Sequence, residues 1–232
     1  MLVRLARTTA TADRNDDPRI DQFGAIDFGS RLTLTTNYFA KDAQIFGQGD
    51  PSDNVYEVVS GAVRSCKLLS DGRCQITAFH LPGDIFGFDL SAAHDTSAEA
   101  IVDTSLRTAK RRSLQQAALG NAAVGNDLWC LTASKLRRAE DHLLLLGRKT
   151  ALERVMSFLV EMDRRLDGSG DLPLPMTRRD IGDYLGLTLE TVSRVLSALH
   201  DKGVIDFSGG ARHIMLRNRD SLRGMELSME LN

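Results

Sequence analysis

Three polar side chains on one predicted helix could form hydrogen bonds with the edges of DNA bases. Glu190, Ser193 and Arg194 are spaced three and four residues apart, so they share one face of that helix. An arginine presents a donor fork that fits guanine O6 and N7, and a glutamate accepts from cytosine N4. Each good contact discriminates between bases by roughly 1–3 kcal/mol. These three residues are the candidates for base reading.

The same spacing has a simpler interpretation, because Glu190 and Arg194 could form a solvated ion pair worth about 0.2–0.5 kcal/mol. The surrounding sequence favours base reading. Gly186 permits a tight turn between two helices, Thr188 is a good cap for the second helix, and Gly203 ends it. This order is typical of a helix-turn-helix, whose second helix enters the major groove with its N-terminal residues.

The first helix of the pair should begin at Thr177, where Asp180 completes a cap signature. Ile181 and Leu185 would lie on the buried face of this helix. Val192 and its apolar neighbours would form the buried face of the second helix. Side chains and backbone N–H groups at helix starts can hold phosphates. The residues expected to contact the DNA backbone are Thr177, Arg178, Thr188 and Thr191.

Elements on both sides of the pair complete a domain. A capping-box pattern at Thr150 and Glu153 predicts a helix that runs to about Leu166, and residues 167–171 should form a loop. Residues 204–216 predict two strands around a Gly-Gly turn, which would form a wing. Residues 148–232 are therefore expected to be a winged helix-turn-helix that binds double-stranded DNA.

A long amphipathic helix is expected over residues 121–146. Its apolar positions alternate in steps of three and four, at Trp129, Thr132, Leu136, Ala139, Leu143 and Leu146. This heptad-like stripe favours packing on a second copy of the helix, although it could also cover the chain's own β domain. Residues 121–147 are assigned as a dimerisation helix, with all these stripe residues except Thr132 in the interface.

The N-terminal half should be an antiparallel β domain. Short β-like runs at 55–59, 62–69 and 74–80 are separated by glycine-containing turns, a pattern typical of a sandwich or jelly roll. The fold class is therefore α+β, with a β-roll over residues 25–120. Residues 1–24 are polar and irregular, and we expect a flexible segment there.

Two of the three cysteines lie on the arms of a predicted hairpin. A two-residue turn at 71–72 would pair Leu69 with Cys74 and Cys66 with Thr77. The two cysteines would then lie on opposite faces, with Cα atoms beyond the roughly 7 Å limit for bridging. We therefore expect no disulfide between them.

Composition sets broad limits on the class of protein. The 232 residues are 42% hydrophobic and 26% charged, with a net charge of -2, as in an ordinary soluble protein. Neither a signal-peptide core nor the roughly 18 apolar residues of a membrane span occurs. Sparse cysteines fit a reducing compartment, so the sequence predicts a cytoplasmic protein without a membrane partner.

A jelly roll could instead carry a cupin-like enzyme. That function needs clustered histidines with a carboxylate to bind a metal. His80 and His94 are isolated in the sequence, and no paired histidine spacing occurs. We therefore expect no catalytic residues, no metal ligands and no enzymatic activity.

From about residue 30 onward the chain resembles the CRP/FNR family of regulators, in its FNR and FixK-like branch. The residues that carry the resemblance lie in the segments Ile45–Asp50, Tyr56–Gly61, Ile76–Asp89 and Arg179–Arg194. The resemblance implies a homodimer whose Glu190, Ser193 and Arg194 read an inverted repeat like TTGA–TCAA. It also implies a contact of the β-roll and residues 71–86 with RNA polymerase.

Two departures from the family bear on its cofactors. This chain has no cysteine before Cys66, so the N-terminal iron–sulfur ligands of FNR are missing. Where cyclic-AMP members carry Gly-Glu and Arg-Ser, residues 87–89 read Gly-Phe-Asp and Glu99 would repel a phosphate. We therefore expect an activator without a cofactor. The alternative is a ligand-gated or redox-gated regulator with an unidentified effector in the β-roll.

Overall fold

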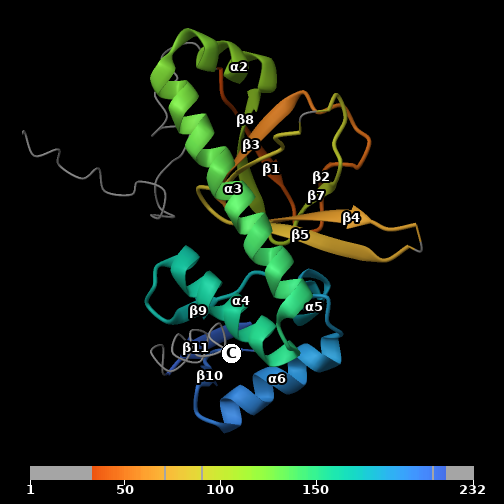
Figure 1. Ribbon diagram of the computed structural model, residues 1–232, viewed down its shortest axis with the longest axis vertical. Coiled ribbons are helices and arrows are strands. Elements are labelled where there is room, and N and C mark those ends of the chain that lie inside the picture. Colours follow the sequence, from red (N-terminus) through yellow and green to blue (C-terminus); the bar gives the residue numbers. More distant parts are fainter. Residues whose placement is uncertain (1–32, 71, 90, 211, 218–232) are drawn as a thin grey trace, which may run out of the picture.

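A computed structural model describes residues 33–217, except 71, 90 and 211. An N-terminal β domain is connected by one long helix to a C-terminal winged helix-turn-helix (Figure 1). The predicted α+β fold with an antiparallel β-roll is therefore confirmed. The expected flexible segment 1–24 lies outside the described residues. No helix in the described part of the chain is long and apolar enough to cross a membrane.

The β domain consists of two antiparallel four-stranded sheets. The first has the order β1-β8-β3-β6 and the second β2-β7-β4-β5. Strands of the first sheet are β1 (Thr35–Phe39), β3 (Asn54–Ser60), β6 (Ile85–Phe86) and β8 (Thr104–Lys110). Strands of the second are β2 (Gln44–Phe46), β4 (Val63–Leu68), β5 (Cys74–His80) and β7 (Ser97–Ala100).

A column of five stacked rings runs through the β domain, with members from both sheets. His94 stacks on Phe46 at 3.6 Å between ring centroids, and Phe46 stacks on Tyr56 at 5.5 Å. Tyr56 then stacks on Phe86 at 5.3 Å, and Phe86 on His80 at 4.5 Å. Burial of these rings removes apolar surface from water and so stabilises the β domain. We call these five rings the aromatic column.

The hairpin between β4 and β5 differs from the predicted register by one residue. Leu68, and not Leu69, lies opposite Cys74, and Cys66 lies opposite Ile76. The loop is longer than two residues: Leu69 N–H donates to Arg73 O, and Gly72 has a φ of +83°. A glycine in this conformation is typical of a three-residue hairpin loop with a bulge.

The corrected register changes the placement of the two cysteines. Cys66 and Leu68 lie on one face of β4, and Cys74 is opposite Leu68, so the two cysteines share a face. The prediction of opposite faces was wrong because it assumed the shorter turn. Both are free thiols, and burial raises the pKa of Cys66 to about 12.

Two consecutive helices follow the β domain. α2 (Arg111–Gly120) was not predicted, since it buries only Leu114 and Ala117. α3 (Ala122–Arg148) is the predicted long helix, and it begins at Asn121, whose side chain accepts from the Ala123 N–H at 2.9 Å. α3 runs past the β domain and reaches the winged helix (Figure 1).

Between residues 151 and 217, the described part of the winged helix contains three helices and a small sheet in the order β10-β11-β9. The helices are α4 (Ala151–Leu166), α5 (Arg178–Leu185) and α6 (Leu189–Asp201). The strands are β9 (Asp171–Pro173), β10 (Ile205–Phe207) and β11 (His213–Leu216). The predicted capping box of α4 and the two wing strands are confirmed. The predicted loop ends one residue earlier than expected, because Asp171 begins β9 and pairs with Met215.

Candidate nucleic-acid interface

The start of α5 is fixed by a capping box, as predicted. Thr177 Oγ1 accepts from the Asp180 N–H at 3.2 Å, and Asp180 Oδ2 accepts from the Thr177 N–H at 2.7 Å. Two orphan donors of the helix end are satisfied in this way. Thr177 is exposed beside this cap, where a DNA phosphate could reach it.

The turn between α5 and α6 depends on two glycines. Gly186 ends α5 with a φ of +62°, as predicted from its position. Gly182, on α5, approaches the turn closely: a Cβ atom there would lie 2.7 Å from the Leu187 carbonyl oxygen. The Leu187 N–H in turn donates to Gly182 O at 2.9 Å. These contacts set the angle between the two helices.

α6 begins at the predicted cap and buries the predicted stripe. Thr188 Oγ1 accepts from the Thr191 N–H at 3.1 Å. Val192, Leu196 and Leu199 are buried in the winged-helix core, and Val195 is half-buried against it. The orientation of α6 is therefore fixed by its apolar face, which leaves the opposite face to solvent.

The predicted base-reading residues lie on that outward face. The Glu190 and Arg194 side chains are 80% and 83% exposed, and their charged atoms are 3.7 Å apart. An ion pair this exposed contributes little to stability, so both side chains can exchange it for other partners. Ser193 is half-buried between them. The structure thus brings a donor fork and a carboxylate together near the N-terminus of α6.

The four residues predicted to contact the DNA backbone differ in their exposure. Thr188 is exposed, and its hydroxyl lies 2.9 Å from that of the half-buried Thr191. The Arg178 guanidinium is half-buried over the Phe207 ring of β10, with 5.4 Å to the ring centroid. This cation–π contact ties the start of α5 to the wing, and the arginine would have to extend past Phe207 to reach a phosphate.

Most of the predicted α3 stripe faces solvent in a single chain. Trp129 and Leu143 are each 74% exposed, and Leu136 and Ala139 are also exposed. Leu146 differs, because it is half-buried and packs against the core of the chain's own winged helix. A run of large exposed apolar side chains marks an interaction surface.

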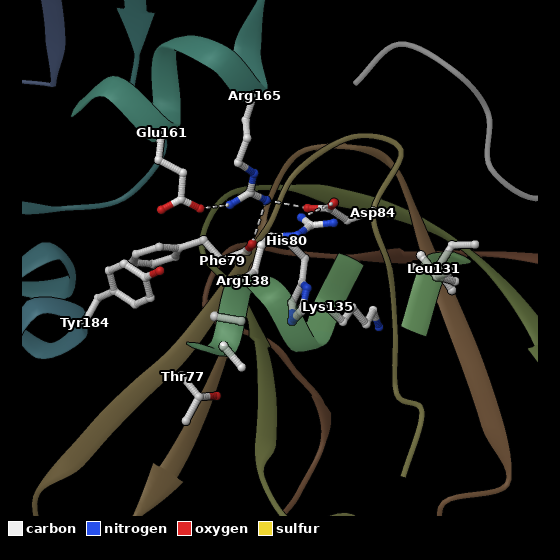
Figure 2. Close-up of a pocket in the computed structure, with 13 residues that line it drawn as sticks. Thr77, Phe79, His80, Asp84, Leu131, Lys135, Arg138, Glu161, Arg165 and Tyr184 are labelled. Carbon is white, nitrogen blue, oxygen red and sulfur yellow. Dashed lines mark hydrogen bonds and ion pairs between the residues drawn. The ribbon is translucent and has the colours of Figure 1, made fainter. Parts of the chain in front are cut away.

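A charged cluster where α3 and α4 meet the β domain had no signal in the sequence. Asp84, which follows β5, pairs with Arg165 of α4 at 2.5 Å and with Arg138 of α3 at 3.3 Å (Figure 2). Burial alone would raise the pKa of Asp84, but the two guanidiniums outweigh it and lower the pKa to about 2. A cavity of about 190 Å³ lies beside this cluster, between β5, α3, α4 and α5.

Other proteins share this architecture and sequence. Residues 36–121 match the cyclic nucleotide-binding domain family, and residues 153–225 match the Crp-like helix-turn-helix domain family. The chain is 45% identical to the nitrogen fixation regulation protein FixK of Azorhizobium caulinodans, over 83% of this chain and 79% of that protein. It is 36% identical to the transcriptional activator protein Anr of Pseudomonas protegens, over 74% and 72% of the two chains.

A solved structure agrees with these relatives. FixK2 from Bradyrhizobium japonicum is 59% identical and superimposes with a TM-score of 0.80, over 84% of this chain and 98% of that one. The relatives are regulators of transcription and not enzymes, as the sequence predicted. The chain therefore belongs to the CRP/FNR family of DNA-binding transcription regulators, among its FixK-type members.

Proposed function

We propose that this regulator binds an inverted repeat like TTGA–TCAA as a homodimer and activates transcription without a bound effector. Glu190, Ser193 and Arg194 read the bases in the major groove. The backbone contacts come from Thr177, Arg178, Thr188 and Thr191. The observation that carries the proposal is the exposed face of α6, where a capped helix with a buried apolar face holds Glu190 and Arg194 in an exposed ion pair with each other.

The dimer forms along α3. Trp129, Leu136, Ala139 and Leu143 form a continuous stripe whose burial against a second copy would remove apolar surface from water. Leu146 contributes by joining the end of α3 to the winged helix. Two-fold symmetry would place the two recognition helices about 34 Å apart, one turn of DNA.

The β domain supports effector-free binding because buried aromatic side chains pack in its interior. The aromatic column occupies the space between the sheets, and Phe46, Tyr56, Phe86 and His94 are buried. Glu99, at the position where a phosphate would bind in cyclic-AMP members, is paired with Arg64 at 2.7 Å. A nucleotide phosphate would have to displace this carboxylate from its arginine.

The same proposal includes a contact with RNA polymerase and a cytoplasmic location. The β4–β5 hairpin projects from the β domain and exposes Leu68, so it is the surface we propose for the polymerase contact. A regulator that recruits polymerase to chromosomal promoters acts in the cytoplasm.

The experiment is the anisotropy of a labelled TTGA–TCAA duplex titrated with the purified protein in air, with and without cyclic AMP. Salt is held fixed because phosphate contacts make the affinity depend on it. A duplex with both half-sites scrambled is the control. We expect tight binding to the repeat that cyclic AMP does not change. Binding that begins only with cyclic AMP, or only without oxygen, would contradict the effector-free proposal and favour the gated alternative.

A further inference from the structure

One arginine of the β domain joins two carboxylates from distant parts of the chain. The Arg64 guanidinium, on β4, lies 2.7 Å from Glu99 of β7 and 2.6 Å from Asp180 of α5. The Arg64 and Asp180 side chains are only 24% and 7% exposed. Partly buried ion pairs are far less screened by solvent than surface pairs. This contact therefore connects the β domain to the helix-turn-helix directly.

The two carboxylate oxygens of Asp180 accept hydrogen bonds from different residues. Oδ2 accepts from the N–H and the hydroxyl of Thr177, and so caps α5. Oδ1 accepts from Arg64 Nη1. The guanidinium thus neutralises a carboxylate that lies beside the proposed phosphate contact at Thr177. Without it, a buried negative charge would remain close to the DNA backbone.

A second bond holds the same helix to the same hairpin. Gln75 Nε2, on β5, donates to the Asp183 carbonyl oxygen at 2.6 Å, near the C-terminal end of α5. Arg64 and Gln75 therefore contact the two ends of α5, and Figure 1 shows α5 beneath the β4–β5 hairpin. Contacts at two points restrict rotation of the winged helix about the end of α3.

We propose that Arg64 is a positioning residue for DNA binding, which holds the helix-turn-helix on the β4–β5 hairpin in the orientation that the operator requires. This inference rests on the proposed DNA site at α6. Arg64 does not touch DNA in this account. It lowers the cost of fixing α6 relative to α3, and hence relative to the second recognition helix of a dimer.

Simultaneous contact with Glu99 and Asp180 requires an arginine at position 64. Burial by itself lowers the pKa of the Arg64 guanidinium, but its hydrogen bond to Glu99 and the charges of both carboxylates raise the pKa above its ordinary value. A planar guanidinium can donate to Glu99 through Nε and Nη2 while Nη1 donates to Asp180. A lysine has a single ammonium nitrogen, which would not reach Glu99 and Asp180 in the same way.

The test compares full-length Arg64→Met with Lys67→Met on the TTGA–TCAA duplex. Lys67 is exposed on the same strand, so its substitution removes an equal charge without breaking this contact. We expect Arg64→Met to bind on the order of tenfold more weakly, with Lys67→Met close to the unsubstituted protein. Arg64→Lys should fall between them. The salt dependence of Arg64→Met should be unchanged, because no phosphate contact is lost.

Hydrogen exchange separates positioning from folding. In Arg64→Met the amides of α5 should exchange faster, while those of β8 and α2 stay as slow as in the unsubstituted protein. If Arg64→Met does not fold, Arg64→Lys is measured in the same way.

Unchanged affinity and unchanged α5 exchange in Arg64→Met would overturn the proposal. A salt slope reduced by about one phosphate contact would also overturn it, because Arg64 would then bind DNA itself. Failure of the unsubstituted protein to prefer the TTGA–TCAA duplex would instead reject the proposed function.

Discussion

At the scale of single residues, the outward face of α6 carries Glu190 and Arg194, whose charged atoms lie 3.7 Å apart. The positions of Glu190 and Arg194 follow from helical spacing once Val192 and Leu196 are recognised as the buried stripe. The partner of Arg178 could not be predicted in the same way. Its guanidinium packs on Phe207, a contact between segments that are 29 positions apart and are joined only by the tertiary fold.

Asp84 gives a prediction about pH. The fold lowers its pKa from 3.8 to about 2, so its contribution to stability is present above pH 3.8 and is lost as the pH falls toward 2. This shift in the pKa of Asp84 corresponds to a contribution of about 2 kcal/mol to the free energy of unfolding. We expect the free energy of unfolding to fall less steeply between about pH 5 and pH 2 in Asp84→Asn than in the unsubstituted protein.

Denaturant titrations at several pH values measure this difference. Asp42→Asn serves as the control, since Asp42 is exposed and its ion pair with Lys41 is also exposed. Equal pH dependence of Asp84→Asn and the unsubstituted protein would show that Arg165 and Arg138 do not hold the Asp84 carboxylate in solution.

At the scale of elements, helix starts were easier to predict than loops. Each cap at Thr150, Thr177 and Thr188 is a local signal, because the cap and the N–H it satisfies lie within three residues. The β4–β5 loop could not be fixed in the same way. Both a two-residue and a three-residue loop are compatible with its Asp-Gly pair, and the choice depends on pairing along the whole hairpin.

Gly182 tests the geometry of the helix-turn-helix. Gly182→Ala should lower the free energy of unfolding by about 1–3 kcal/mol, because the new Cβ would lie 2.7 Å from a backbone oxygen that cannot move independently. Gly147→Ala in α3 is the matched control. It has open space, so it should raise the free energy of unfolding by about 0.5–1 kcal/mol. A neutral Gly182→Ala would mean that the Leu187 carbonyl does not lie this close to α5 in solution.

Leu143 tests the dimer. A glutamate there would place a charge within the apolar stripe, so Leu143→Glu should be a monomer in sedimentation experiments at concentrations where the unsubstituted protein dimerises. It should also bind the operator more weakly. Leu68→Glu makes the same change at an exposed leucine on the β hairpin and should remain a dimer. If Leu143→Glu stays dimeric, the interface lies elsewhere.

At the scale of the whole molecule, the fold class was predictable but the contacts between its parts were not. Strand runs, the α3 stripe and the wing are periodic patterns, so composition and spacing reveal them. The contacts of Asp84 with Arg165 and of Arg64 with Asp180 join residues 81 and 116 positions apart. Such pairs have no local signature. They nevertheless join the winged helix to the β domain.

We propose that α6 reads bases through Arg194. The most direct measurement compares the affinities of the unsubstituted protein and Arg194→Ala for two duplexes. One is the TTGA–TCAA repeat, and the other carries A·T in place of the guanine pair in each half-site. We predict that Arg194→Ala costs roughly 1–3 kcal/mol on the repeat and little on the altered duplex, so that it no longer distinguishes the two. An equal loss on both duplexes would contradict the claim and would make Arg194 a contact to the DNA backbone.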